Sequence, residues 1–404
     1  MSPSVVSSPG PQQVESPEQS PVPDVYLRSE QDYRPYPFEQ VRGSLPEAYV
    51  WPEELRPTRS YEEGVAENAW EEEEEEEEEE QAEGAEEAIG SSKEKEEESD
   101  MMNIPVVDLS EGVESEAVRT AIVTACQEWG VFYVANHGVP AQVLQRAHRA
   151  ASRVFRLSPD AKAANARRAG SLSGFGKPHI SKFYDSLMWS EGFTVACDSI
   201  ATLSRRLFPA DPAAHLYFTS TFEEYAGALR ELSSKILGAL LLGLNVDVKR
   251  FESTHFELRD CPSYFHLNYY PPCPQPMMTI GLAPHTDSTL LTILYQGDDF
   301  GLETWKGQWK LVAPIKDSLI VHVGDLLQII SNDKYKSPLH RALVNKRKER
   351  LSVVYLYPPP ATKTLYPIEE GIDSGSLYKP LSWLDYVQAK GKYFMGAFEY
   401  FKNK

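Results

Sequence analysis

The chain has 404 residues, of which 41% are apolar, and its formal net charge at pH 7 is −20. A chain of this length can bury one large core or two ordinary ones. The first 100 residues hold 30 acidic and 7 basic residues, whereas the other 304 hold 30 acidic and 33 basic ones. The acidity therefore belongs to the N-terminal quarter, where it argues against binding of nucleic acid or anionic membranes.

The cysteine and hydropathy patterns indicate in which cellular compartment the protein is expected. The sequence contains four scattered cysteines without a CxxC pair, no run of eighteen apolar residues, and no basic start followed by an apolar core. Disulfide scaffolds, membrane spans and secretory signals leave other patterns. We therefore expect a cytoplasmic protein that neither crosses nor binds a membrane.

The N-terminal region, residues 1–102, is predicted to be disordered. Residues 1–33 are rich in Pro, Ser and Gln, and ten consecutive glutamates at Glu71–Glu80 repel one another. Between them, residues 35–57 carry enough large apolar side chains to form a short docking segment. An acidic arm that contacts a basic partner remains an open alternative for the glutamate-rich stretch.

A helix-rich domain is predicted over residues 103–255. Asn103–Ser110 reads as a short strand whose final serine is suited to open a helix, and Gly130–Gly138 reads as another strand. Apolar residues recur at helical spacing in three stretches. These are residues 114–129, 141–157 and 212–245.

The period changes from helix to strand in residues 256–404. Eight short strands are predicted, with the sequences YFHLNYY, STLLTILYQ, GLETWK, QWKLVAP, SLIVHVG, LLQIIS, HRALVN and RLSVVYLYP. Even spacing between turn residues is typical of an antiparallel sandwich or barrel, with a jelly roll as the leading form. An amphipathic helix over residues 381–402 closes the chain. The predicted fold class is α+β, a double-stranded β-helix (jelly roll) supported by N-terminal and C-terminal helices.

Two histidines and one aspartate form a candidate metal site. His285 and Asp287 lie two residues apart within GLAPHTDSTLLTIL, and His340 begins another predicted strand. Two His and one carboxylate on one face of a metal, with the opposite face open, are typical of non-haem Fe(II) oxygenases. Alone, the His-x-Asp pair is more often a polar turn. The remaining histidines are expected to be structural or exposed: His137, His148, His179, His215, His255, His266 and His322.

A second pair of residues supports the interpretation of the first three as a metal site. Arg350 and Ser352 alternate along one predicted strand and therefore point to the same face. A guanidinium grips a planar carboxylate through two parallel hydrogen bonds, and a neighbouring hydroxyl completes the grip. A metal site with such a clamp implies a dicarboxylic cosubstrate, for which 2-oxoglutarate is the obvious candidate.

Several longer motifs lie along the C-terminal three quarters of the chain: IPVVDLS, WGVFYVANHGVP, MWSEGFTV, NYYPPCPQP, GLAPHTDSTLLTILYQ, VGDLLQIISNDKYKSPLHRALVN and RLSVVYLYPPP. With these motifs the chain resembles the plant-type 2-oxoglutarate and Fe(II)-dependent dioxygenases, and most closely the gibberellin 3-beta-dioxygenases. The resemblance runs continuously over residues 103–404 and includes Ser44–Pro52.

The resemblance implies site residues, cofactors and an activity. His285, Asp287 and His340 would bind Fe(II), Arg350 with Ser352 would clamp 2-oxoglutarate, and Asn268 with Tyr270 would contact that cosubstrate. The implied reaction also consumes O₂, with ascorbate in support, and hydroxylates a small apolar carboxylic acid, most simply a gibberellin precursor at its 3-beta position. Residues 256–404 would then be the catalytic jelly-roll domain.

The sequence leaves other substrates and other classes of protein open. Residues 173–187 depart from the Arg-Ile wording of the 3-oxidases, so another gibberellin position, a flavonoid or another terpenoid stays open. Lys177, His179 and Lys182 in that segment are candidate substrate anchors. A non-catalytic metal-binding jelly roll and a zinc hydrolase are the rivals of another class, and both leave the Arg350–Ser352 clamp without a purpose.

Overall fold

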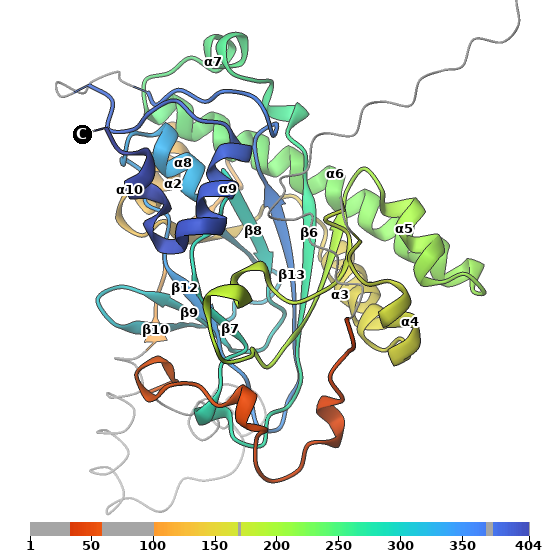
Figure 1. Cartoon of the computed structure of the whole chain (residues 1–404). Helices are drawn as coiled ribbons and strands as arrows, with labels where there is room; N and C mark the ends of the chain where they lie inside the picture. The colour runs from red at the N-terminus through yellow and green to blue at the C-terminus, as the bar shows by residue number, and fades with distance from the viewer. Residues whose placement is uncertain (1–32, 59–100, 169–170, 369–374, 404) are drawn as a thin grey trace, which may run out of the picture.

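Two β-sheets of unequal size face each other at the centre of the computed structural model, which describes residues 33–58, 101–168, 171–368 and 375–403 (Figure 1). In sheet order, the five-stranded sheet consists of β1 (Met101–Met102), β10 (Trp309–Val312), β9 (Leu302–Trp305), β12 (His340–Ala342) and β7 (Leu282–His285). The eight-stranded sheet consists of β2 (Val106–Asp108), β3 (Val131–Ala135), β11 (Leu319–Val323), β8 (Leu291–Tyr295), β13 (Arg350–Tyr357), β6 (Tyr264–Tyr270), β5 (Glu191–Ala196) and β4 (Gly174–Phe175).

The larger sheet has one face for the core and one for the site. Because side chains alternate along a strand, Leu351 and Val353 of β13 point to the main hydrophobic core. Arg350 and Ser352 point the other way, into the space between the two sheets. Antiparallel pairing of β13 with β6 places Ser352 opposite Asn268. The alternation in the sequence therefore sets which residues line the interior.

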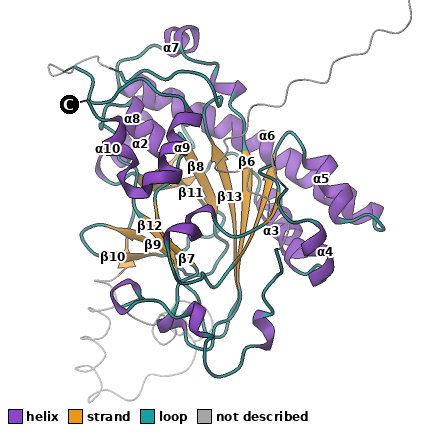
Figure 2. Ribbon diagram, in the orientation of Figure 1, coloured by secondary structure: helices purple, strands orange, loops and turns teal. Residues whose placement is uncertain are grey.

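Helices cover the outer face of the larger sheet (Figure 2). The longest, α6, begins at Pro212 after Asp211, whose side chain accepts a hydrogen bond from the backbone of Ala214 at 2.9 Å. The helices are α2 (Glu116–Glu128), α3 (Ala141–Phe155), α4 (Pro159–Ala164), α5 (Ile200–Leu207), α6 (Pro212–Gly243), α7 (Val248–Thr254), α8 (Asp325–Ile330), α9 (Trp383–Tyr393) and α10 (Ala397–Phe401). Within the described ranges, none of them is long and apolar enough to cross a membrane.

Residues 33–58 pack against the body of the protein, where we expected a docking segment. Three short 3₁₀ turns carry this segment: Phe38–Gln40, Glu47–Tyr49 and Glu53–Leu55. The indole of Trp51 is 1% exposed and donates to the carbonyl of Leu187 at 2.9 Å. Phe38 and Tyr49 pack edge-on against Trp189. The predicted disordered tail and acidic stretch lie outside the described residues and stay predictions.

The expected strand LLQIIS was wrong, because these residues form helix α8. A short apolar run lacks the period that separates a buried strand from a buried helix. Tertiary contacts decide the matter: the amides of Asp325 and Leu326 donate to the carbonyls of Asp287 and Thr289 at 2.7 and 3.1 Å. The turn after His285 thus satisfies the free N–H groups that begin this helix.

Two other helix boundaries also differ from the sequence prediction. The single C-terminal helix expected over residues 381–402 breaks after α9, where Phe394 takes a positive φ of 49°, and the chain resumes as α10. Ser110 lies in a turn, and α2 begins after Ser115 instead. Both errors arise because helical spacing of apolar residues locates a helix better than it locates the helix ends.

We expect Trp51→Ala to lower the free energy of unfolding by about 3–5 kcal/mol, the cost typical of removing a buried tryptophan. Chemical denaturation followed by circular dichroism measures this loss. Glu47→Ala is the matched control, because Glu47 is exposed on the same segment. An unchanged denaturation midpoint for Trp51→Ala would show that the segment does not stabilise the fold.

Candidate metal centre

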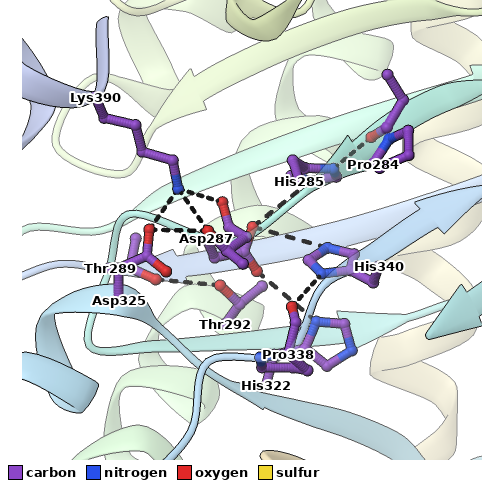
Figure 3. Close-up of polar contacts among 12 residues, drawn as sticks. Pro284, His285, Asp287, Thr289, Thr292, His322, Asp325, Pro338, His340 and Lys390 are labelled. Carbon is purple, nitrogen blue, oxygen red and sulfur yellow. Dashed lines mark hydrogen bonds and ion pairs between the residues drawn. The ribbon is translucent and has the colours of Figure 1, made fainter. Parts of the chain in front are cut away.

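His285, Asp287 and His340, which we call the triad, converge between the two sheets (Figure 3). His285 is the last residue of β7, Asp287 lies in the following turn, and His340 is the first residue of β12. Antiparallel pairing of these strands places His340 directly opposite His285. One potential ligand atom from each side chain lies within 4.8 Å of the other two. The strand pairing therefore brings together residues that are 53 to 55 positions apart.

Backbone carbonyls orient both imidazole rings. Nδ1 of His285 donates to the carbonyl of Ala283 at 2.8 Å, and Nδ1 of His340 donates to that of Pro338 at 3.2 Å. A carbonyl can only accept, so each Nδ1 carries the proton and each Nε2 keeps its lone pair. Both Nε2 atoms face Asp287 Oδ1, at 3.8 and 3.9 Å. This is the outer-shell arrangement by which proteins prepare histidine for metal binding.

The charge states of the triad also suit a metal ion. Burial lowers the pKa of His285 and of His340, which keeps both rings neutral at physiological pH. Burial by itself raises the pKa of Asp287. At the acid pH where this carboxyl would take up a proton, positive charge on His340 and the other neighbouring imidazoles outweighs burial and holds that pKa below its usual value. Neutral imidazoles and an ionised carboxylate are the species that bind a divalent cation.

A third histidine lies beside the triad. His322 of β11 is 2% exposed, its ring centroid is 4.5 Å from that of His340, and its Nδ1 is 3.7 Å from Asp287 Oδ2. Neither ring nitrogen of His322 has a hydrogen-bond partner, and Asp287 Oδ2 has none either. We expected His322 to be structural or exposed. The feature of the sequence that distinguishes it is a polar residue within the apolar strand LIVHV.

A buried cation holds the turn of the triad from the opposite side. Lys390 of α9 donates to the carbonyl and the hydroxyl of Thr286 at 2.6 and 2.9 Å, and it forms an ion pair with Asp325. The Asp325 carboxylate also accepts from Tyr386 at 2.9 Å and from Thr286 at 3.1 Å. Because Thr286 lies between His285 and Asp287, this network ties the turn of the triad to the C-terminal helix.

The sequence-predicted clamp residues line a cavity of about 140 Å³ that adjoins the triad. Arg350, Ser352, Asn268 and Tyr270 are all in its wall. The Arg350 guanidinium lies 5.2 Å from the centre of the Tyr270 ring, and its Nη2 donates to Gln296 at 3.2 Å. No pattern in the sequence links Gln296 to this arginine.

Arg350 is a buried cation whose polar contacts are neutral. Its side chain is almost fully enclosed, its Nε has no hydrogen-bond partner, and no ion pair among the described residues involves it. Burial accordingly lowers the pKa of Arg350, although it stays charged at physiological pH. At Gly301, φ is +144° and a Cβ atom would lie 2.8 Å from Arg350 Cδ, so glycine leaves room for the arginine. A carboxylate of a bound molecule would be a suitable partner for this guanidinium.

A larger cavity of about 190 Å³ lies on the other side of the triad. His285 and Asp287 belong to the walls of both cavities. Of the three candidate anchors, His179 and Lys182 line the larger cavity, whereas Lys177 is exposed outside it. The triad therefore lies where the two cavities meet.

Comparison with known proteins identifies the family. Residues 104–211 match the non-haem dioxygenase N-terminal family named for morphine synthesis, and residues 261–359 match the 2OG-Fe(II) oxygenase superfamily. Gibberellin 3-beta-dioxygenase 3 of Arabidopsis thaliana is 38% identical over 309 residues, which are 74% of this chain and 86% of the relative. The chain belongs to the 2OG-Fe(II) oxygenase superfamily. Gibberellin 3-beta-dioxygenase 1 of Pisum sativum is 35% identical over 73% of this chain and 78% of its own.

Solved structures of the superfamily have the same fold. The crystal structure of JOX2 in complex with 2OG, Fe and JA matches with a TM-score of 0.69 and 28% identity, over 91% of this chain and 96% of that one. The dioxygenase for auxin oxidation from rice matches with a TM-score of 0.58 and 25% identity, over 71% and 95%. The predicted α+β fold with a jelly-roll core is confirmed.

The protein is thus a 2-oxoglutarate-dependent dioxygenase that uses Fe(II), 2-oxoglutarate and O₂. The residues present fit these groups: two imidazole lone pairs and a carboxylate converge on one point, and a buried guanidinium without an anionic partner lies in the adjoining cavity. As in the gibberellin dioxygenases that it resembles, its substrates are small molecules.

We expect Lys390→Met to destabilise the protein by about 3–5 kcal/mol, because it leaves the buried carboxylate of Asp325 without its cation. The change should also weaken Fe(II) binding, since Thr286 loses two donors. Denaturation and metal titration measure the two effects. Lys392→Met is the control, because Lys392 is exposed on the same helix and should leave both quantities unchanged. Unaltered stability of Lys390→Met would contradict the role of the ion pair.

Proposed function

We propose that this dioxygenase hydroxylates a gibberellin precursor at its 3-beta position, with His285, Asp287 and His340 as the Fe(II) ligands. The observation that carries the proposal is the position of the triad at the junction of two cavities of different chemistry. One cavity suits a dicarboxylic cosubstrate and the other suits an apolar acid. The similarity to gibberellin 3-beta-dioxygenases at 33–38% identity supports this substrate.

The smaller cavity would hold 2-oxoglutarate. Arg350 and Ser352 would bind its distal carboxylate, because a buried guanidinium without an anion costs free energy that a carboxylate recovers. Asn268 and Tyr270, which lie opposite Ser352 and Arg350 on β6, would line the same molecule. Gln296 holds the guanidinium in place from the side. The keto-acid end would then lie toward the triad.

The larger cavity would hold the substrate. Its wall is largely apolar, with side chains such as Ile180, Phe183, Leu282 and Phe394, and the cation Lys182 also lines it. Gibberellin precursors combine an apolar ring system with a carboxylate, so they match this lining. Part of the wall consists of His179, Ile180, Lys182 and Phe183. These residues belong to segment 173–187, where the sequence differs from the usual 3-oxidase motif. That departure therefore falls where the substrate would be recognised.

Fe(II) bound to the triad would supply O₂ activation coupled to the oxidative decarboxylation of 2-oxoglutarate, giving succinate, CO₂ and a hydroxylated product. The protein itself would position the reactants and exclude water from the site. The carbonyls of Ala283 and Pro338 hold the two imidazoles, and the Lys390 network holds the turn between His285 and Asp287. Phe183 stacks on Phe394 over the larger cavity, with ring centroids 4.5 Å apart.

An alternative substrate is favoured by one observation. The JOX2 structure that matches 91% of this chain contains JA, so oxidation of that or another small molecule by the same chemistry is the second candidate. Other gibberellin positions, flavonoids and other terpenoids use the same machinery and belong in the same comparison.

The purified protein with Fe(II), ascorbate, 2-oxoglutarate and a panel of gibberellin precursors, JA and flavonoids tests the proposal. We expect a 3-beta-hydroxylated gibberellin by mass spectrometry, formed in step with succinate. Asp287→Ala should abolish the product and lower the bound iron, whereas the exposed control Glu349→Ala should retain both. Turnover of another panel member but of no gibberellin would overturn the substrate assignment.

Arg350→Gln should raise the KM for 2-oxoglutarate roughly 10- to 100-fold, because the charged hydrogen bonds to the distal carboxylate are lost. Succinate formation at varied 2-oxoglutarate concentration measures this. Arg347→Gln is the control, because it removes the same charge from an exposed position three residues earlier. If the two variants had the same KM, Arg350 would not be the carboxylate clamp.

A further inference from the structure

His322 is a buried imidazole that neither the fold nor the proposed triad explains. It lies on β11 between β3 and β8, where every residue of the strand is buried. Leu319, Val321 and Val323 of this strand join the main hydrophobic core, so His322 points to the opposite face, into the site. An imidazole without a hydrogen-bond partner is costly there, and a leucine or valine would pack without that cost.

The two oxygens of Asp287 face different neighbours. Oδ1 faces Nε2 of His285 and Nε2 of His340, at 3.8 and 3.9 Å. Oδ2 faces Nδ1 of His322 at 3.7 Å and has no hydrogen-bond partner. The carboxylate is thus divided between the metal side and the His322 side (Figure 3).

His322 stands outside the group of atoms that would surround the metal. The residues whose ligand atoms lie mutually within 4.8 Å are His285, Asp287 and His340 alone, among those that the structure describes. His322 therefore has the place of an outer partner of the carboxylate. Its Nδ1 lies just beyond hydrogen-bond length from Oδ2, so a small rotation of the carboxylate brings the two into contact.

We propose that His322 is a positioning residue of the metal centre: it donates a hydrogen bond from Nδ1 to Asp287 Oδ2 and so confines the carboxylate to binding the metal through Oδ1 alone. This inference rests on the triad being the metal ligands, as in the proposed function. A carboxylate bound through one oxygen leaves open the positions that the cosubstrate and O₂ need. Outer partners of this kind typically change metal affinity 10- to 100-fold.

Anaerobic titration of the apoprotein with Fe(II), and separately with Co(II), tests the proposal without turnover. His322→Leu should bind Fe(II) about 10- to 100-fold more weakly. His322→Met is a second donor-free variant of similar volume, should the leucine variant not fold. His322→Asn should restore affinity to within a few-fold of wild type, because the asparagine amide can place an N–H near the position of Nδ1. Ile320→Val, on the same face of the same strand, is the control and should bind normally.

Three results would overturn the assignment. Wild-type affinity in both donor-free variants would show that the hydrogen bond contributes nothing, and an equal loss in His322→Asn would show that donation from Nδ1 is not the cause. A changed ligand-field spectrum of bound Co(II) in His322→Leu, with the intensity expected for loss of one nitrogen ligand, would make His322 a direct ligand. Asp287→Ala separates this from the proposed function: if it too retained wild-type affinity, the triad itself would be wrong.

Discussion

The site depends on one constraint: side chains that could bind a metal lie far apart in the chain, and they must meet in a space that excludes water. Pairing of β7 with β12 meets this constraint, because it sets His285 opposite His340 and leaves Asp287 in the turn that follows. The second sheet then closes the space with Asn268 and Ser352. Apart from the triad and Arg350, the buried charges next to the site are paired, as Lys390 and Asp325 are with each other.

The residues around the turn between His285 and Asp287 show which buried charges offset one another. Lys390 neutralises Asp325, and both hold Thr286, so the helix at the end of the chain fixes the turn that carries Asp287. The amide of Asp325 donates to the carbonyl of Asp287, which couples helix α8 to the same turn. The polar atoms left without partners at the site include Arg350 Nε and Asp287 Oδ2, and the latter faces His322 Nδ1 at 3.7 Å.

Regular patterns were the most predictable part of the fold. The alternation in RLSVVYLYP identified β13 and the common face of Arg350 and Ser352, and the 3.6-residue period identified α6 almost to its ends. Prediction failed where the apolar run was too short to show a period, and where a helical period continued past the end of a helix. LLQIIS became a helix because the His-x-Asp turn accepts its first amides, and the C-terminal helix broke at Phe394. Both outcomes depend on contacts that no local period contains.

The sequence by itself determined the residue types of the site, the alternation that turns them inward and the membership of the oxygenase superfamily. Spacing could link Arg350 to Ser352, because they share one strand. Only the tertiary structure decided that His322, Gln296 and Lys390 surround the same centre. They come from β11, the residue after β8, and α9, and their meeting depends on strand order and helix docking. The physical reason is that the role of a buried polar residue depends on the groups that it contacts. Tertiary packing sets those contacts, and spacing along the sequence does not.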